Sequence, residues 1–458
     1  MNTATRTTTT TTTTADDDRA AARVEADIAP DYDQPGNAVG YLRTAGAVRE
    51  RAAALLARAR RGESTWFSIG ADATLDTAAQ AVADAARERY PSGRIPFHSR
   101  WRHFEAGGVD RLARLDALLG EDVTPRERAR VQIDLALVSV LLDAGAGPDW
   151  HYVEPASGQR FTRSEGLGVA SFHAFTAGLF SSDAERPLQA DAAGLRGLSG
   201  DRLAEAFQVS AANPLVGLSG RTTLLRRLGE ALAQQPEIFG HDGAPRPGGL
   251  FDALVSAYGP AAPPTAEISA EEILQLVLDS LSRIWPAGNA LDGDILTGSG
   301  DPALALGDCW PHGAVRGPGL TDGWMPFHKL SQWLTYSLLE PFEWAGIKVR
   351  GIDRLTGLPE YRNGGLFIDT GVIVARDEAF LEGTWQVGDE FVVEWRALTV
   401  ALLDEVAPRV RALLGRSAEE MPLACVLEGG TWAAGRVLAQ RLRAGAPPLI
   451  IESDGTVF

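Results

Sequence analysis

Apolar residues recur every three or four positions along most of this chain, a spacing that favours α-helices over strands. The pattern predicts helices at 39–60, in an alanine-rich stretch that ends near 90, at 124–144, 270–285, 326–340 and 431–443. It also predicts a strand or turn at 66–69, strands at 364–374 and 423–427, and a strand pair within 449–458. The predicted fold class is therefore mainly α with a few short strands.

Signals for helix ends support three of these helices. Thr124–Glu127 and Ser269–Glu272 each place a hydroxyl at the N-cap and a glutamate three residues later, which is the pattern of a capping box. Pro341 is expected to kink or stop the helix at 326–340, because proline lacks the backbone N–H that a helix interior uses.

The two ends of the chain differ in character. Residues 1–35 lack hydrophobic periodicity and contain an unbroken threonine tract, Thr7–Thr14, which predicts a disordered tail. Residues 36–458 carry the apolar periodicity without a repeat or a clear linker, and they predict a single large, mainly helical catalytic domain.

Composition and charge narrow the class of protein. The chain has 458 residues, 45% of them hydrophobic and 22% charged, which is enough apolar sequence for a large core. Its net charge of −17 disfavours a nucleic-acid partner. Its two cysteines suit a reducing compartment, and no run of about 18 apolar residues predicts a membrane span. We therefore expect a cytoplasmic protein without a nucleic-acid or membrane partner.

Lysine is rare in this sequence, and one lysine lies in a chemically suggestive place. Only Lys329 and Lys348 occur among the 43 basic residues. On the helix predicted at 326–340, Lys329 shares one face with Gln332 and Tyr336. The face is either a solvated outer surface or the wall of a site that needs a deprotonatable amine.

A carboxylate follows some thirty residues later in a segment rich in turn residues. Glu360, Tyr361 and Arg362 place a carboxylate, a phenol and a guanidinium in succession. A lysine and a carboxylate that converge on one cavity are suited to cleavage of a C–N glycosidic bond. The carboxylate would stabilise positive charge on the sugar or orient water, and the lysine would stabilise the departing group or tune the carboxylate.

Sequence motifs for metal binding, nucleophilic catalysis and nucleotide binding are weak or missing. Most histidines stand beside aromatic residues, and the sequence contains no HExxH, paired CxxC, GxSxG or Walker motif. We predict no metal and no cofactor. The segment Glu428–Thr431 is either an anion-binding helix start or a plain turn followed by an N-cap.

Several motifs resemble the uracil-catabolism protein four family, long described as a domain of unknown function. The resemblance covers about residues 35–458. The segments that carry it are Phe97–Trp101, Ser164–Leu167, Pro326–Leu334, Leu358–Gly365 and Leu427–Trp432. It implies a role in a pathway that opens the pyrimidine ring, with ribosylurea as an intermediate, urea as a later product and other enzymes of uracil catabolism as partners.

A more distant similarity concerns the queuosine-nucleotide N-glycosidases, whose fold is related to helix-hairpin-helix DNA glycosylases. Their lysine–glutamine segment and their later carboxylate–tyrosine–arginine segment are matched by Lys329, Gln332 and Glu360–Arg362, with glutamate in place of the family's aspartate. This similarity implies a DNA-glycosylase-like core at about 125–375, a C-terminal extension at about 376–458, and Glu360 as the catalytic carboxylate beside Lys329.

The resulting hypothesis is a hydrolase that cleaves a ribosylurea-type compound, a small ribosyl substrate, to urea and a ribose product. Glu360 and Lys329 are the predicted catalytic residues. The predicted substrate-binding residues are His98, Arg100, Trp101, Glu165, Gln332, Trp333, Tyr361 and Arg362.

Two alternatives remain at this point. The first is a metal-dependent amidohydrolase that acts on a ureido group through His98, His103, His312 or His328. The second is a non-catalytic partner of the ring-opening enzyme.

Overall fold

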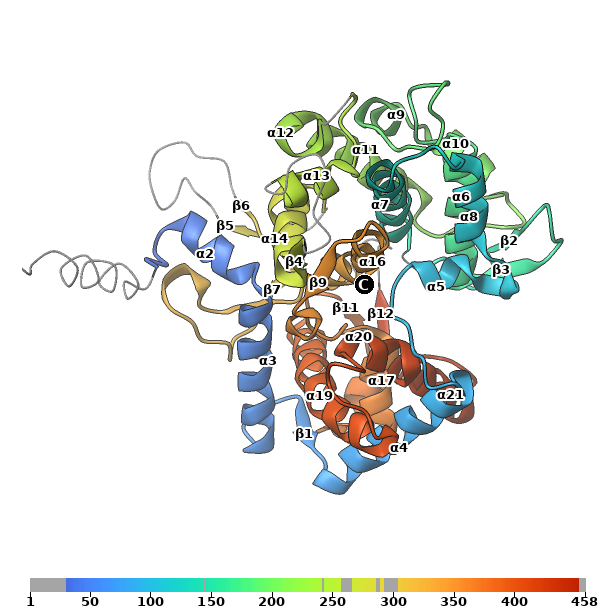
Figure 1. Cartoon of the computed structure of the whole chain (residues 1–458). Helices are drawn as coiled ribbons and strands as arrows, with labels where there is room; N and C mark the ends of the chain where they lie inside the picture. Colours follow the sequence, from blue (N-terminus) through green and yellow to red (C-terminus); the bar gives the residue numbers. More distant parts are fainter. Residues whose placement is uncertain are drawn as a thin grey trace, which may run out of the picture.

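The computed structural model describes residues 30–143, 145–240, 243–256, 266–285, 289–291 and 304–452. Helices dominate these residues, which confirms the predicted mainly α fold class (Figure 1). The predicted threonine-rich tail lies mostly at 1–29, outside the described residues. The DNA-glycosylase-like core and the boundary at 376 stay predictions.

The helices vary in length from one turn to seven. In chain order they are α2 (Pro35–Leu42), α3 (Ala45–Arg60), α4 (Asp72–Arg89), α5 (Trp101–Phe104), α6 (Arg111–Leu119), α7 (Pro125–Leu141), α8 (Arg163–Thr176), α9 (Ala192–Arg196), α10 (Gly200–Ala206), α11 (Leu218–Gln234), α12 (Pro236–Phe239), α13 (Gly249–Val255), α14 (Ala270–Leu281), α16 (Lys329–Trp344), α17 (Tyr361–Asp369), α18 (Ala379–Glu382), α19 (Glu390–Leu414), α20 (Leu423–Val426) and α21 (Trp432–Arg443). A π-helical turn, η6 (Leu427–Thr431), joins α20 to α21.

The strands are two or three residues long and pair two by two. The antiparallel pairs are β1 (Phe67–Ile69) with β10 (Ile373–Ala375), β2 (His151–Val153) with β3 (Arg160–Thr162), β5 (Ala290–Leu291) with β6 (Leu304–Ala305), and β7 (Cys309–Pro311) with β8 (Trp324–Pro326). The parallel pairs are β4 (Glu267–Ser269) with β9 (Lys348–Arg350), and β11 (Thr384–Gln386) with β12 (Ile450–Glu452).

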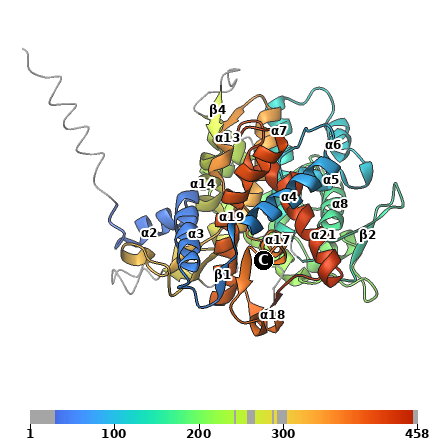
Figure 2. The same ribbon diagram turned by 90° about the horizontal axis from the view of Figure 1, so that it is seen from below.

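Helix α16 lies in the middle of the molecule and packs against α7 and α14 (Figure 1). Helices from the two ends of the chain meet on its other side, where α19 packs against both α3 and α4 (Figure 2). Helix α17 packs against α21 in the same part of the fold. The first residues of α16 and α17 are therefore fixed by segments far apart in the sequence.

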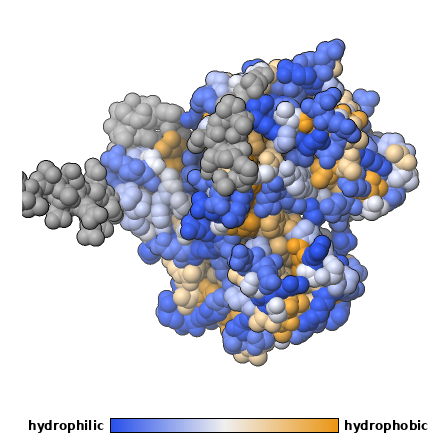
Figure 3. Space-filling view, viewed as in Figure 1, coloured by the Kyte–Doolittle hydropathy of each residue, from blue (hydrophilic) through white to orange (hydrophobic). Residues whose placement is uncertain are grey.

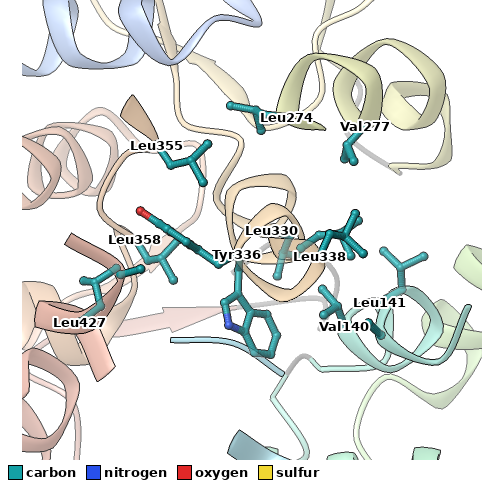
Figure 4. Packing of buried hydrophobic residues seen from close by; sticks show 14 of the residues in the cluster. Val140, Leu141, Leu274, Val277, Leu330, Tyr336, Leu338, Leu355, Leu358 and Leu427 are labelled. Atoms are coloured by element: carbon teal, nitrogen blue, oxygen red, sulfur yellow. The ribbon is translucent and has the colours of Figure 1, made fainter. Parts of the chain in front are cut away.

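The packing around α16 is apolar on two sides, as Figure 4 shows. Leu338 faces the side chains of α7 and α14, whereas Tyr336 points towards Leu355 and Leu358. Outside this core, hydrophilic residues cover most of the face seen in Figure 3, with hydrophobic residues in small groups between them. No helix among the described residues is long and apolar enough to cross a membrane.

The predicted helix ends are right at two sites and wrong at a third, and at Pro341, where a kink or a stop was predicted, the stop does not occur. The Thr124 hydroxyl accepts from the N–H of Glu127 (3.2 Å), and Ser269 forms a full capping box with Glu272. The single helix predicted at 39–60 is instead α2 followed by α3, because Thr44 caps a new helix by accepting from the N–H of Ala47. Pro341 does not end α16, which continues to Trp344.

Two predicted strands are helical. Residues 361–369 form α17, since the Glu360 side chain caps a helix there. Of the predicted strand at 364–374, only residues 373–374 belong to a strand, β10. The strand at 423–427 and the turn after it belong to the run α20–η6–α21. Of the strand pair predicted within 449–458, β12 pairs with β11 instead, and 453–458 lie outside the described residues.

A glycine in the π-helical turn permits close packing of α4. A β-carbon at Gly430 would lie far inside van der Waals contact with the backbone carbonyl oxygen of Val82. We expect Gly430→Ala to lower the free energy of unfolding by about 2 kcal/mol, because two packed helices must separate. Urea denaturation measures this change. Gly415→Ala is the control for packing, because a β-carbon at Gly415 would meet no neighbouring atom. Its φ is positive, so this control carries the cost of the backbone conformation alone. If Gly430→Ala lowered the free energy of unfolding less than Gly415→Ala does, the packing argument would be contradicted.

Candidate functional site

Lys329 is the first residue of α16, at the helix end that is held by a buried aspartate. Its backbone N–H donates to Asp308 Oδ2 (3.0 Å). His328, directly before it, has a left-handed backbone (φ +50°), and its Nε2 hydrogen-bonds to the carbonyl oxygen of Leu42 (2.9 Å). The uncommon backbone at His328 and the fixed helix start together set the direction in which Lys329 leaves the helix.

Charged groups surround the Lys329 amine. Burial and, to a smaller extent, the Arg396 guanidinium lower its pKa, Asp308, Glu360 and Asp143 oppose that shift, and the resulting pKa is about 8. The amine therefore changes its charge close to neutral pH. A lysine in this state can act as a cation or as a neutral amine, as an active site requires.

Glu360 is the N-cap of α17. Its Oε2 accepts from the N–H of Arg362 (2.7 Å) and its Oε1 from the N–H of Asn363 (2.6 Å). Burial raises the pKa of Glu360, while these two N–H groups, Lys329 and His98 lower it. The helix N-terminus thus holds a carboxylate that is largely withdrawn from water.

The two predicted catalytic residues interact electrostatically. The charge of Glu360 raises the pKa of Lys329, and the charge of Lys329 lowers that of Glu360. Both residues begin helices, α16 and α17, that different parts of the chain hold in place. The two side chains thus stand at two helix N-termini, close enough for each charge to influence the other.

A buried ion pair lies behind Lys329. The Arg396 guanidinium donates to both oxygens of Asp308 (2.8 and 2.7 Å) and lies 4.0 Å from the ring centre of Phe327. Asp308 also accepts from Trp310 Nε1 (2.7 Å). Although burial raises the pKa of Asp308, Arg396 and the other donors lower it to about 2. Asp308 is therefore ionised at neutral pH, and its fixed position anchors the start of α16.

Three basic side chains lie around the indole ring of Trp333. The Arg100 guanidinium lies 5.6 Å from its ring centre, and the rings of His98 and His103 lie 6.4 and 5.8 Å away. Arg100 is fully buried; it donates to Ser139 Oγ (2.6 Å) and pairs with Asp143 (3.2 Å). The structure thus brings the predicted residues His98, Arg100 and Trp333 together.

Gln332, Tyr361 and Arg362 lie in the first turns of α16 and α17. Gln332 is buried and accepts from the N–H of Thr356 (3.2 Å), so the polar stripe on α16 is not a solvated outer face. The Arg362 guanidinium stacks 4.7 Å from the ring centre of Tyr361, and its Nη2 donates to the carbonyl oxygen of Gly445 (3.1 Å). These contacts direct the Arg362 side chain towards the end of α21.

Trp101 and Glu165 occupy different surroundings. The Trp101 indole packs against Phe104 and Trp344 in the core and donates to the carbonyl oxygen of Ser337 (2.9 Å). Glu165 is partly exposed and lies 3.7 Å from Arg436. Neither contact involves Lys329 or Glu360.

The histidines of the alternative metal site have separate partners. His312 pairs with Glu394 (3.2 Å) and His328 with the Leu42 carbonyl oxygen, whereas His98 and His103 lie beside Trp333. Within the described ranges, no group of three His, Cys, Asp or Glu side chains is arranged to hold a metal ion.

The segment 428–431 has a different role from the predicted ones. Thr431 is inside a helical run, so the anion-binding helix start and the N-cap at this position were wrong. The buried Glu428 carboxylate instead accepts from Tyr90 (2.8 Å) and Arg89 (2.9 Å) and pairs with His98 (2.8 Å).

The sequence did not point to Asp308, Arg396 or Asp143 as members of the site. Arg396 had a signal, because it interrupts a long apolar run in α19 and a charge at such a place needs a partner. Asp308 lies in a loop segment, and nothing in the sequence indicates which arginine it meets.

Lys329 is expected to cost stability at neutral pH. Its pKa in the folded protein, about 8, is below the ordinary 10.5, so the unfolded chain binds the proton more tightly. Stability attributable to this group therefore rises as the pH increases from 8 to 10.5. Lys329→Met should raise the free energy of unfolding by about 1–2 kcal/mol at pH 7, with a smaller gain at pH 10.

Urea denaturation at the two pH values measures this effect, and the exposed Lys348→Met is the matched control. Lys348 pairs with Glu267 at the surface, and its replacement should leave stability unchanged at both pH values. A Lys329→Met variant that is less stable than the wild type at pH 7 would contradict the assignment of a costly buried amine.

Comparisons with known proteins cover nearly the whole folded chain. A family model described as "Protein of unknown function (DUF1688)" matches residues 41–458. The chain is 37% identical over 453 residues to "Uracil catabolism protein 4" of Lachancea kluyveri, covering 92% of this chain and 99% of that protein. It is 39% identical over 370 residues to "Protein urg3" of Schizosaccharomyces pombe, covering 80% of this chain and 84% of that protein.

Proposed function

The chain belongs to the family described as protein of unknown function (DUF1688), and from this membership and its lysine–carboxylate site we propose that it acts in uracil catabolism as an N-glycosidase. The substrate is a ribosylurea-type compound, and the products are urea and a ribose. The name of the Lachancea kluyveri relative supports the pathway. The electrostatic pair of Lys329 and Glu360 carries the choice of reaction.

The reaction requires stabilisation of a positively charged sugar. As the bond between C1′ and nitrogen breaks, positive charge develops on the ring oxygen and on C1′. A carboxylate fixed at this position lowers the barrier without having to reorganise. Glu360 meets this demand because two backbone N–H groups hold its oxygens in place.

Lys329 complements the carboxylate. With a pKa near 8, its amine is mostly protonated at pH 7 and can donate a hydrogen bond to the carbonyl oxygen of the departing urea. Its charge also counteracts the burial that raises the pKa of Glu360. Lys329 thereby opposes part of the rise in pKa that burial causes at Glu360.

The direct test is product analysis. Purified full-length protein is incubated with ribosylurea and, separately, with its 5′-phosphate, and urea, ammonia and the sugar are quantified. We expect urea and sugar in equal amounts from at least one compound. Ammonia and carbon dioxide in place of urea would indicate hydrolysis of the ureido group and would overturn the proposal. Absence of turnover with both compounds would also overturn it.

A further inference from the structure

His98 and Glu428 form a carboxylate–imidazole pair that the reaction described above does not yet use. The His98 Nδ1 atom lies 2.8 Å from Glu428 Oε2. Its other ring nitrogen, Nε2, makes no hydrogen bond within the part of the chain that the structure describes, and the side chain keeps 17% exposure. A buried carboxylate thus holds one ring nitrogen and leaves the second one available.

The carboxylate itself is rigidly held. Glu428 accepts from the Tyr90 hydroxyl (2.8 Å) and from Arg89 (2.9 Å), both at the end of α4. It lies in the π-helical turn η6, and such turns occur frequently at functional sites. The backbone N–H of His98 donates to the carbonyl oxygen of Ala424 (3.0 Å), one turn before Glu428. Imidazole and carboxylate are therefore attached to the same short stretch of helix.

The imidazole is on the side of the lysine–carboxylate pair. Its ring lies 6.4 Å from that of Trp333, which is four residues after Lys329 on α16. The charges of His98 and Glu360 also interact. The His98 ring thus lies beside α16, the helix that begins with Lys329, and close enough to Glu360 for their charges to interact.

We propose that His98 is the proton donor to the departing nitrogen and that Glu428 is its positioning residue; this inference rests on the proposed N-glycosidase activity. The C1′–N bond breaks, its electron pair passes to the ureido nitrogen, and that nitrogen takes the proton from His98 Nε2. The neutral imidazole, with Nδ1–H donated to Glu428, then accepts a proton from the water that attacks C1′. One water is consumed, and His98 regains its proton.

The leaving group explains the need for such a donor. A urea anion is a poor leaving group, so the nitrogen must be protonated as the bond breaks. Both oxygens of Glu360 already accept backbone hydrogen bonds, which suits a carboxylate that stabilises charge better than one that donates a proton. The imidazole at His98 supplies the missing acid.

A comparison of two leaving groups tests this assignment. Wild type, His98→Gln, Glu428→Gln and Glu360→Gln are assayed with ribosylurea and with p-nitrophenyl β-D-ribofuranoside, whose phenolate departs without a proton. We expect His98→Gln to lower kcat at least ~10²-fold on ribosylurea and less than about fivefold on the nitrophenyl compound. Glu428→Gln should lower kcat about tenfold on ribosylurea with little change in KM, whereas Glu360→Gln should impair both reactions.

His173→Gln is the matched control, because His173 forms an equally short pair with Glu154 (2.8 Å). It should leave both reactions unchanged. Equal losses of His98→Gln on the two substrates, or no loss, would overturn the role of His98 while leaving the N-glycosidase intact. A wild-type protein without turnover of either compound would overturn the proposed function and the inference with it.

Discussion

Glu360→Gln is expected to lower the turnover of ribosylurea by about 10²- to 10³-fold. Glutamine has nearly the same shape, and its side-chain oxygen can still accept one of the two backbone N–H groups that hold Glu360. The substitution removes the negative charge that would face the developing positive charge on the sugar. The loss should therefore appear in kcat, measured by urea release at saturating substrate.

The helix-capping role of Glu360 must be separated from its chemical role. Loss of one cap interaction costs about 1 kcal/mol, so the variant should remain folded. Unfolding in urea checks this point. Glu271→Gln is the matched control, since Glu271 also lies in the first turn of a helix, α14, but contacts Arg354 at the surface (2.8 Å). It should retain activity within threefold. If Glu360→Gln behaved in the same way, the catalytic assignment would be wrong.

Local sequence signals predicted several of the longer helices, but they missed α8, α11 and the longest helix, α19, as well as the short ones. The caps at Thr124 and Ser269 are residue patterns that act over three positions, and both are present in the structure. Helix α17 has nine residues, and its Gly364–Gly365 pair weakens the helical pattern, so the sequence suggested a strand. The helix start is fixed by the side chain of Glu360, which the sequence indicated only as a catalytic residue.

The candidate site also contains some residues that the sequence indicated and others that it did not. Lys329 and Glu360 were predicted from the sequence because lysine is rare and because their motifs resemble a known family. Asp308 and Arg396 are 88 residues apart, and only the packing of α19 against the loop before α16 brings them together. Spacing along the chain carries no record of such a pair. The π-helical turn that holds Glu428 was missed for the same reason, because packing against α4 fixes it.

Arg396→Met should lower the free energy of unfolding by about 3–5 kcal/mol, because it leaves the Asp308 carboxylate buried without its main partner. The pKa of Asp308 in the folded protein, about 2, is below the ordinary 3.8. The stability that this carboxylate contributes is thus present above pH 4 and is lost as the pH falls towards 2. The difference between wild type and variant should shrink over that range.

The matched control is Glu63→Ala, which removes one partner of the exposed Arg61–Glu63 pair (2.8 Å) and should not change the urea midpoint measurably. An Arg396→Met variant as stable as the wild type would show that Asp308 does not depend on Arg396.

The same variant links the ion pair to the chemistry of the site. Arg396 lowers the pKa of Lys329, so its removal should move that pKa above 8. The chain contains only two lysines, so selective isotope labelling gives two side-chain NMR signals, with exposed Lys348 as the internal reference. Titration of both signals in wild type and Arg396→Met measures the shift directly. If the Lys329 signal titrated unchanged while the protein lost stability, Arg396 would support the fold without tuning the amine. A shift confined to Lys329 would establish that the buried ion pair sets the charge state on which the proposed reaction depends.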